Sequence, residues 1–185
     1  MYFINFFRDA SNDSVKKMLN CLPSLPKQAG SYALFIQLRE VHYLRIGQLG
    51  PAEFLPGLYV YLGSAGGPGG LRARLGRHLR GSDKRHWHID HLRAVGDVVG
   101  FCAVRHQDLD SESIPVECRW SQALAGRPDT GVPLPGFGCS DCRAGCPAHL
   151  IAIDDADDFA IERYRQILAE SLGISPGLII SQPGA

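Results

Sequence analysis

The chain lacks both a net charge and any long apolar run. Its 19 lysine and arginine residues balance 19 aspartate and glutamate residues, so the molecule as a whole is not steered toward nucleic acid. No apolar stretch approaches the roughly 20 residues that a helix needs to cross a bilayer. Residues 1–7 are apolar but few, have no basic region before them and meet Arg8 at once. We therefore expect them to begin a strand or helix rather than to form a secretory signal.

Cysteine use indicates a reducing compartment. The chain has six cysteines, and without a secretory signal we expect free thiols and a cytoplasmic location. Cys102 and Cys118 stand among apolar residues, as buried thiols often do. Only the cysteines near the C-terminal end therefore need a chemical explanation.

At 185 residues the chain is long enough for one domain with a buried core, and it shows no internal repeat. Apolar and β-branched runs predict strands at residues 31–39, 41–46, 57–63, 97–105 and 149–153, of which the first two form a hairpin. Periodicity predicts helices at residues 14–19, 70–80, 114–125 and 159–172, with a helix or turn at 85–95. Residues 48–56 and 126–147 are predicted to be loops. The pattern indicates a small α/β (α+β) domain, with a central antiparallel sheet flanked by helices.

The chain divides into three parts by composition. We expect an N-terminal extension over residues 1–28 and the main domain over residues 29–153. A C-terminal helix and tail over residues 154–185 are expected to pack on that domain, and residues 178–180 are expected to add an edge strand.

A basic helix follows a strand and a loop rich in glycine and proline. Glycine and proline let the loop turn sharply and leave its N–H groups accessible. Within about two and a half helical turns the helix then places Arg72, Arg74, Arg77, His78 and Arg80. This density of cations indicates contact with phosphate, and the alternative is a solvated basic face.

Two tyrosine motifs stand on either side of a long insertion, at Gly30-Ser31-Tyr32 and Tyr61-Leu62-Gly63. Arg74 follows on the basic helix, and Glu117 lies near the start of a later helix. In this order the motifs resemble the signature of the GIY-YIG nuclease superfamily, and the chain is most similar to its Uri-type branch, whose members are sometimes joined to an endonuclease III-like glycosylase. The resemblance covers about residues 29–153 and includes residues 59–65, 77–79, 86–90, 117–118 and 136–142.

The resemblance implies a GIY-YIG-like fold and an endonuclease that hydrolyses DNA phosphodiester bonds with Mg²⁺ or Mn²⁺. Tyr32 and Tyr61 match the tyrosines that line the family's site, one of which helps to activate the attacking water. Arg74 matches the arginine that pairs with the phosphate. Glu117 matches the carboxylate that binds Mg²⁺. His78, one turn after Arg74, is a candidate to donate or accept a proton.

The implied partner is DNA in a branched, damaged or single-stranded form, processed in DNA repair, with a functional link to a DNA glycosylase. No membrane partner is expected. The candidates for contact with nucleic acid outside the chemical step are Arg72, Arg77, Arg80, Lys84, Arg85, His86 and His88.

The chain departs from the family pattern at three points. Ser31 and Leu62 stand where the motif has isoleucine, and we expect both only to pack. The spacing from Tyr32 to Tyr61 is much longer than usual, so residues 41–56 must loop out. The family's asparagine after the glutamate has no clear counterpart, although Asp129 lies nearby.

A histidine cluster follows the basic helix. In a helix His86 and Asp90 would share a face, whereas in an extended turn His86 and His88 would. Either phosphate contact or a His–Asp pair that orients a base would suit a nuclease. The alternative is a surface helix anchored by Trp87.

A cysteine cluster lies in the second predicted loop, with Cys139, Cys142, Cys146 and His149 in Cys-x₂-Cys-x₃-Cys-x₂-His spacing. This spacing is compatible with a structural zinc site. The alternative is a packed loop near the active site, in which Asp141 fixes an arginine or a helix end.

Two other functions stay open. One is a non-catalytic nucleic-acid-binding module with the same fold. The other is a zinc-dependent hydrolase or deaminase, because His88-x-Asp90 and Cys139-x₂-Cys142 resemble the deaminase signature. That signature carries glutamate where this chain has Asp90.

Overall fold

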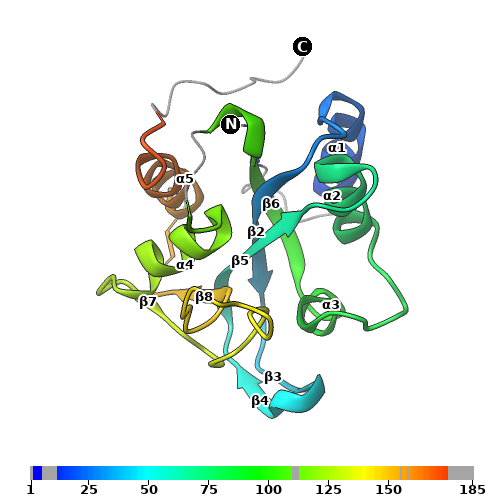
Figure 1. Ribbon diagram of the computed structural model, residues 1–185. Helices are drawn as coiled ribbons and strands as arrows, with labels where there is room; N and C mark the ends of the chain where they lie inside the picture. Colours follow the sequence, from blue (N-terminus) through cyan, green and yellow to red (C-terminus); the bar gives the residue numbers. More distant parts are fainter. Residues whose placement is uncertain (1, 6–11, 110–112, 155, 158, 175–185) are drawn as a thin grey trace.

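Figure 1 shows a computed structural model of the chain. It describes residues 2–5, 12–109, 113–154, 156–157 and 159–174. The edge strand predicted at residues 178–180 lies outside these described ranges.

The central element is a six-stranded antiparallel sheet with the strand order β1-β6-β2-β5-β8-β7. In that order the strands are Tyr2–Asn5, Asp97–Arg105, Gly30–Leu38, Gly57–Ala65, Leu150–Ile153 and Thr130–Gly131. The longest ladders join β2 to β5 and to β6. The predicted α/β fold with a central antiparallel sheet is confirmed.

Helices cover both faces of this sheet (Figure 1). On one face lie α1 (Asn12–Cys21), α2 (Gly70–Arg80) and α3 (His88–Arg93), and on the other lie α4 (Val116–Ala125) and α5 (Ala160–Glu170). Short 3₁₀ turns occur at Leu22–Ser24, Gly47–Leu49 and His106–Asp108. Among the described residues, none of these helices has the length and apolar character needed to cross a membrane.

The two helical layers enclose two separate cores, and β2 contributes to both. Tyr32 and Leu34 pack with α1, α2 and α3, whereas Ala33 and Phe35 pack with α4 and α5. Successive strand residues point to opposite faces. Strand β2 is therefore buried on both sides, which explains its nearly continuous apolar sequence.

The predicted hairpin between residues 31–39 and 41–46 is wrong in its pairing. Strand β3 (His42–Ile46) pairs with β4 (Gly50–Phe54) in a separate two-stranded sheet. The middle of the expected loop at 48–56 is thus a strand. Pro51 suggested a loop, but its missing N–H is tolerated in a two-stranded sheet with open edges.

Strand β2 pairs instead with β5 over its full length, from Gly30 opposite Ala65 to Leu38 opposite Gly57. Residues 41–56 leave the main sheet at this end and form the β3–β4 hairpin (Figure 1). The expectation that the insertion loops out is therefore confirmed, and the two tyrosine motifs lie on adjacent strands.

Helix α2 and strand β6 coincide with their predicted ranges. Helix α1 is longer than residues 14–19, and α3 is shorter than residues 85–95. The loop predicted at 126–147 contains the two-residue strand β7.

Candidate active site

A cavity of about 770 Å³ lies beside β5, near the point where β8 stops pairing with it. The ladder between the two strands ends at Tyr61, opposite Leu150. One further hydrogen bond, 2.8 Å from the Leu62 N–H to the His149 carbonyl, precedes the opening. Beyond it, Gly63 and Ser64 line the cavity. Side chains from both faces of the sheet can therefore reach the same space.

Four of the five predicted catalytic residues line this cavity. Tyr32 comes from β2, Tyr61 from β5, Arg74 from α2 and Glu117 from the first turn of α4. They derive from segments that are far apart in the sequence. Asp141 adds a second carboxylate to the lining.

The two tyrosines pack against each other over a glycine. Their ring centroids are 6.3 Å apart, and Tyr32 stands directly opposite Gly63 across the β2–β5 ladder. A β-carbon at Gly63 would come within 2.5 Å of the Tyr32 hydroxyl oxygen. The Tyr-Leu-Gly motif thus ends in glycine because the phenol needs that space.

The fifth predicted residue, His78, lies behind Tyr32, with its Nε2 atom 2.8 Å from the Tyr32 hydroxyl oxygen. Burial lowers the pKa of His78 to about 3, so the imidazole is neutral at pH 7. Desolvation by burial is also the main reason why the pKa values of Tyr32 and Tyr61 are raised above that of a free phenol. Both hydroxyls are therefore protonated, and His78 acts on the cavity through Tyr32.

Arg74 is held by the indole of Trp87, whose ring centroid lies 4.1 Å from the guanidinium carbon. Arg77 lies 3.9 Å from the same centroid but also pairs with both oxygens of Asp90, at 2.9 and 2.8 Å. No carboxylate among the described residues pairs with Arg74. Its charge is thus available to an anion in the cavity.

Glu117 is positioned by Ser31, whose hydroxyl donates a hydrogen bond of 2.7 Å to Oε2 of the carboxylate. The same Ser31 oxygen lies 2.9 Å from Nε2 of His106. Since the serine proton goes to Glu117, the histidine N–H donates to the serine. Ser31 is fully buried, so it does more than pack, contrary to our expectation for this position.

The predicted nucleic-acid contacts fall into two groups. Arg72 donates to the carbonyls of Pro23 and Leu25 and ties α2 to the preceding turn. Arg77 is engaged by Asp90. The exposed members are Arg80, Lys84, Arg85 and His86, and two of these, Arg80 and Arg85, line a second cavity of about 510 Å³.

The histidine cluster is built around structural contacts. Asp90 accepts hydrogen bonds of 2.9 Å from the backbone N–H groups of both His86 and Trp87, in addition to its pair with Arg77. His88 accepts a hydrogen bond of 3.1 Å from the Gly138 N–H through Nδ1. The contacts of Asp90 are therefore structural, in line with the surface-helix alternative. The side chain of His88 contacts the loop that follows residue 136.

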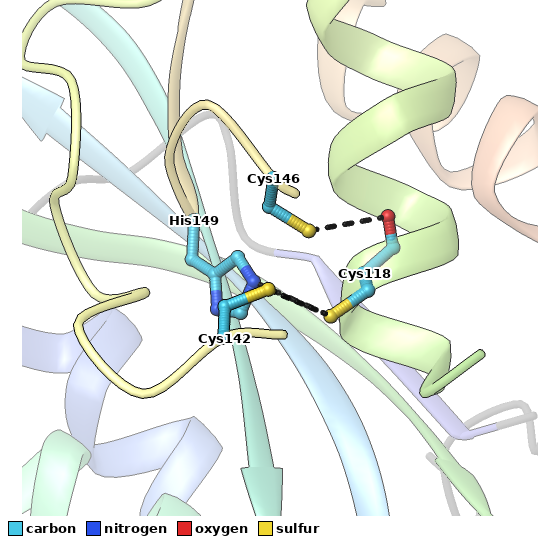
Figure 2. A group of neighbouring side chains, drawn as sticks. All are labelled: Cys118, Cys142, Cys146 and His149. Carbon is cyan, nitrogen blue, oxygen red and sulfur yellow. Dashed lines mark hydrogen bonds between the residues drawn. The ribbon is translucent and has the colours of Figure 1, made fainter. Parts of the chain in front are cut away.

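Three of the four predicted zinc ligands come together, and a different cysteine completes the group (Figure 2). The donor atoms of Cys118, Cys142, Cys146 and His149 all lie within 4.8 Å of one another, close enough to hold a metal ion. The Cys139 thiol instead points to the Cys146 carbonyl, at 3.6 Å.

Sequence reasoning missed Ser31 and Cys118 as site residues. Ser31 could have been found because it places a polar residue where the motif has isoleucine. Cys118 follows Glu117 directly, but it was assigned to the core because its neighbours are apolar. Asp129, the nearby alternative to the family's asparagine, forms an ion pair of 2.9 Å with Arg127 and does not line the cavity.

Comparison with known protein families matches residues 31–170 to a family described as "Domain of unknown function DUF123". The matched range contains the four predicted catalytic residues that line the cavity and the four donors of the cysteine group. No curated protein and no solved structure matches the chain.

Proposed function

The chain belongs to the DUF123 family, and we propose that it is a metal-dependent endonuclease of the Uri-type GIY-YIG branch, acting on branched, damaged or single-stranded DNA. One observation carries the proposal. Tyr32, Tyr61, Arg74 and Glu117, which resemble the functional positions of the GIY-YIG signature, line one cavity although they come from four different elements. A cavity of about 770 Å³ also has room for a phosphodiester and its flanking sugars.

Arg74 is the proposed phosphate ligand. Its guanidinium can donate two parallel hydrogen bonds to a phosphodiester, and Trp87 restricts its position before substrate binds. This pairing would neutralise charge that develops on the phosphate during the attack of water.

The tyrosines are proposed to hold the attacking water. Because both hydroxyls are protonated, each can donate a hydrogen bond or accept one from water, and neither starts as a phenolate. The neutral His78 holds the Tyr32 hydroxyl through their 2.8 Å contact. Because burial lowers the pKa of His78 to about 3, the imidazole is a weak base, and its proposed role is to orient Tyr32 toward the water.

Glu117 is the proposed ligand for Mg²⁺ or Mn²⁺. A single firmly held carboxylate suits Mg²⁺, which commonly keeps several waters and completes its shell with substrate phosphate. Ser31 limits the rotation of this carboxylate, and Asp141 offers a second oxygen ligand on the cavity wall. When bound, the ion would supply positive charge to the phosphate and leaving oxygen.

DNA is proposed to approach over the exposed basic residues next to α2. Arg80 is the last residue of α2, the helix that carries Arg74, and Lys84 and Arg85 follow that helix; all three are exposed. Since the chain has no net charge, this local patch would supply the electrostatic attraction.

A cleavage assay tests the proposal. Purified protein with Mg²⁺ or Mn²⁺ is incubated with flapped, nicked, forked and single-stranded DNA, and Glu117→Gln and Arg74→Ala should each lower cleavage by at least 100-fold, on the order expected for lost charge stabilisation. Matched controls are Glu170→Gln and Arg163→Ala on α5, which should cleave like the original protein. Cleavage that survives both cavity variants would refute the assigned site. Binding without cleavage on every substrate would instead support a non-catalytic module.

The deaminase alternative receives no support from the described residues. It needs His88 beside Cys139 and Cys142, but the donor group contains Cys142 without the other two. Asp90, which would replace the catalytic glutamate, is engaged by Arg77 and two backbone N–H groups.

A further inference from the structure

We propose that Cys118, Cys142, Cys146 and His149 bind one structural zinc ion, which fastens the loop at residues 136–149 to helix α4. Figure 2 shows the three sulfur atoms and the imidazole turned toward one another, with Cys118 on the helix and the other three on the loop. Cys139, the nearest other cysteine in the sequence, is excluded from the ligand set.

The spacing of the donors fits tetrahedral coordination. Thiolates about 2.3 Å from a zinc ion at tetrahedral angles stand about 3.8 Å from one another. The Cys118 sulfur lies 3.5 Å from that of Cys142 and 3.7 Å from Nε2 of His149. All four donors fall within 4.8 Å. A sulfur separation of 3.5 Å is far longer than the roughly 2.05 Å of a disulfide, so both thiols are free to bind a metal ion.

The chemistry of the donors selects zinc. Three sulfurs and one imidazole nitrogen are soft and borderline ligands, which favour Zn²⁺ over the Mg²⁺ proposed for Glu117. Four protein donors also close the tetrahedral shell, as in structural rather than catalytic zinc sites. The two metals would therefore occupy separate positions with separate functions.

The loop has few other means of attachment to α4. Its segment from residue 136 to 149 contains no helix or strand. Hydrogen bonds join its two ends to each other, from the Gly136 N–H to the Pro147 carbonyl and from the His149 N–H to the Phe137 carbonyl. Across to the helix, Gln122 and Ser121 donate to the carbonyls of Ala144 and Ala148. A zinc ion would bind the three donors on the loop together with Cys118 at the start of the helix, and would so link the loop to α4.

This attachment reaches the proposed active site. Cys118 adjoins Glu117, and the same loop carries Gly138, where a β-carbon would come within 2.9 Å of the Tyr61 ring. Zinc would thereby hold two walls of the cavity in place. This consequence rests on the proposed nuclease function, but the metal site itself does not.

Metal analysis tests the site without reference to activity. Protein purified without chelator should contain one zinc per chain by elemental mass spectrometry. Cys118→Ser, Cys142→Ser and Cys146→Ser should each lose most of this zinc, whereas Cys139→Ser should retain it. Substitution with Co²⁺ should give thiolate charge-transfer absorption that is absent from Cys118→Ser.

A measurement on the unaltered protein guards against variants that fail to fold. Alkylation followed by peptide mass spectrometry should show Cys118, Cys142 and Cys146 protected until a chelator is added, while Cys139 reacts in both conditions. No stoichiometric zinc would overturn the proposal, as would equal loss of zinc from Cys139→Ser and Cys118→Ser. A disulfide between Cys118 and Cys142 in freshly purified protein would also overturn it.

Discussion

The ring of Tyr32 lies over Gly63, its direct partner across the β2–β5 ladder. A β-carbon on Gly63 would stand 2.5 Å from the phenolic oxygen and 2.6 Å from the carbon that bears it. Neither atom is at the end of a flexible chain, since the hydroxyl is also held by His78. The position of Tyr32 therefore depends on the absence of a side chain at residue 63.

Gly63→Ala should displace Tyr32 and break its hydrogen bond to His78. The free energy of unfolding should fall by about 1–3 kcal/mol, which is the usual cost of overpacking a buried site. Urea denaturation measures this change. Gly66→Ala is the matched control, because a β-carbon at Gly66 meets nothing within 4 Å. Equal stability of the two variants would contradict the assigned role of Gly63.

His78 should make stability depend on pH. Its ordinary pKa is 6.5, and burial lowers the folded value to about 3. As the pH falls below 6.5 the unfolded chain takes up a proton that the folded chain refuses, so stability is lost between pH 6.5 and 3. The loss reaches at most about 1.4 kcal/mol per pH unit for this group.

Denaturation at several pH values checks this sign. Between pH 6.5 and 3, the free energy of unfolding of His78→Gln should depend less on pH than that of the original protein. An unchanged slope in His78→Gln would show that other groups govern the acid loss of stability.

Much of the fold was predictable because the local signals were strong. Helix α2 and strand β6 match their predicted ranges since a Gly/Pro loop or a clear apolar run marks their bounds. The pairing of β2 was not predictable, because sequence proximity favoured β3, whereas β2 is a central strand whose two edges pair with the long strands β5 and β6.

The part of the site that consists of motif residues was predictable. Tyr32, Tyr61, Arg74 and Glu117 were found from a resemblance, and the sheet edge brings them together. Cys118 could not be placed with the other donors from spacing, because it reaches them only through the packing of α4 against the loop.

The basic residues should separate by function in a binding experiment. Arg72 is bound to backbone carbonyls, so Arg72→Ala should lower the free energy of unfolding without changing the salt dependence of DNA binding. Arg80, Lys84 and Arg85 are exposed, and each alanine variant should reduce the slope of log affinity against log salt by about one if it contacts a phosphate. Fluorescence anisotropy of labelled DNA at several salt concentrations measures the slope, and urea denaturation measures the free energy of unfolding. A reduced slope in Arg72→Ala would return that residue to the DNA-binding surface.

Ser31 should control the metal requirement of the proposed nuclease. Ser31→Ala removes the 2.7 Å hydrogen bond to Glu117 and the acceptor of His106, and a hydrogen bond to a charged group contributes about 1.5–3 kcal/mol. A carboxylate that rotates more freely binds metal less tightly, so the Mg²⁺ concentration for half-maximal cleavage should rise several-fold, with a smaller change in the rate at saturating Mg²⁺.

The matched control is Thr130→Val, which removes a hydroxyl that donates 2.6 Å to the Leu124 carbonyl at the other end of α4. This variant should lose stability without a change in the Mg²⁺ requirement, because its hydrogen bond does not touch Glu117. Titration of Mg²⁺ at fixed DNA concentration distinguishes the two. If both variants shift the Mg²⁺ dependence equally, the effect comes from loosening of α4 rather than from the orientation of Glu117.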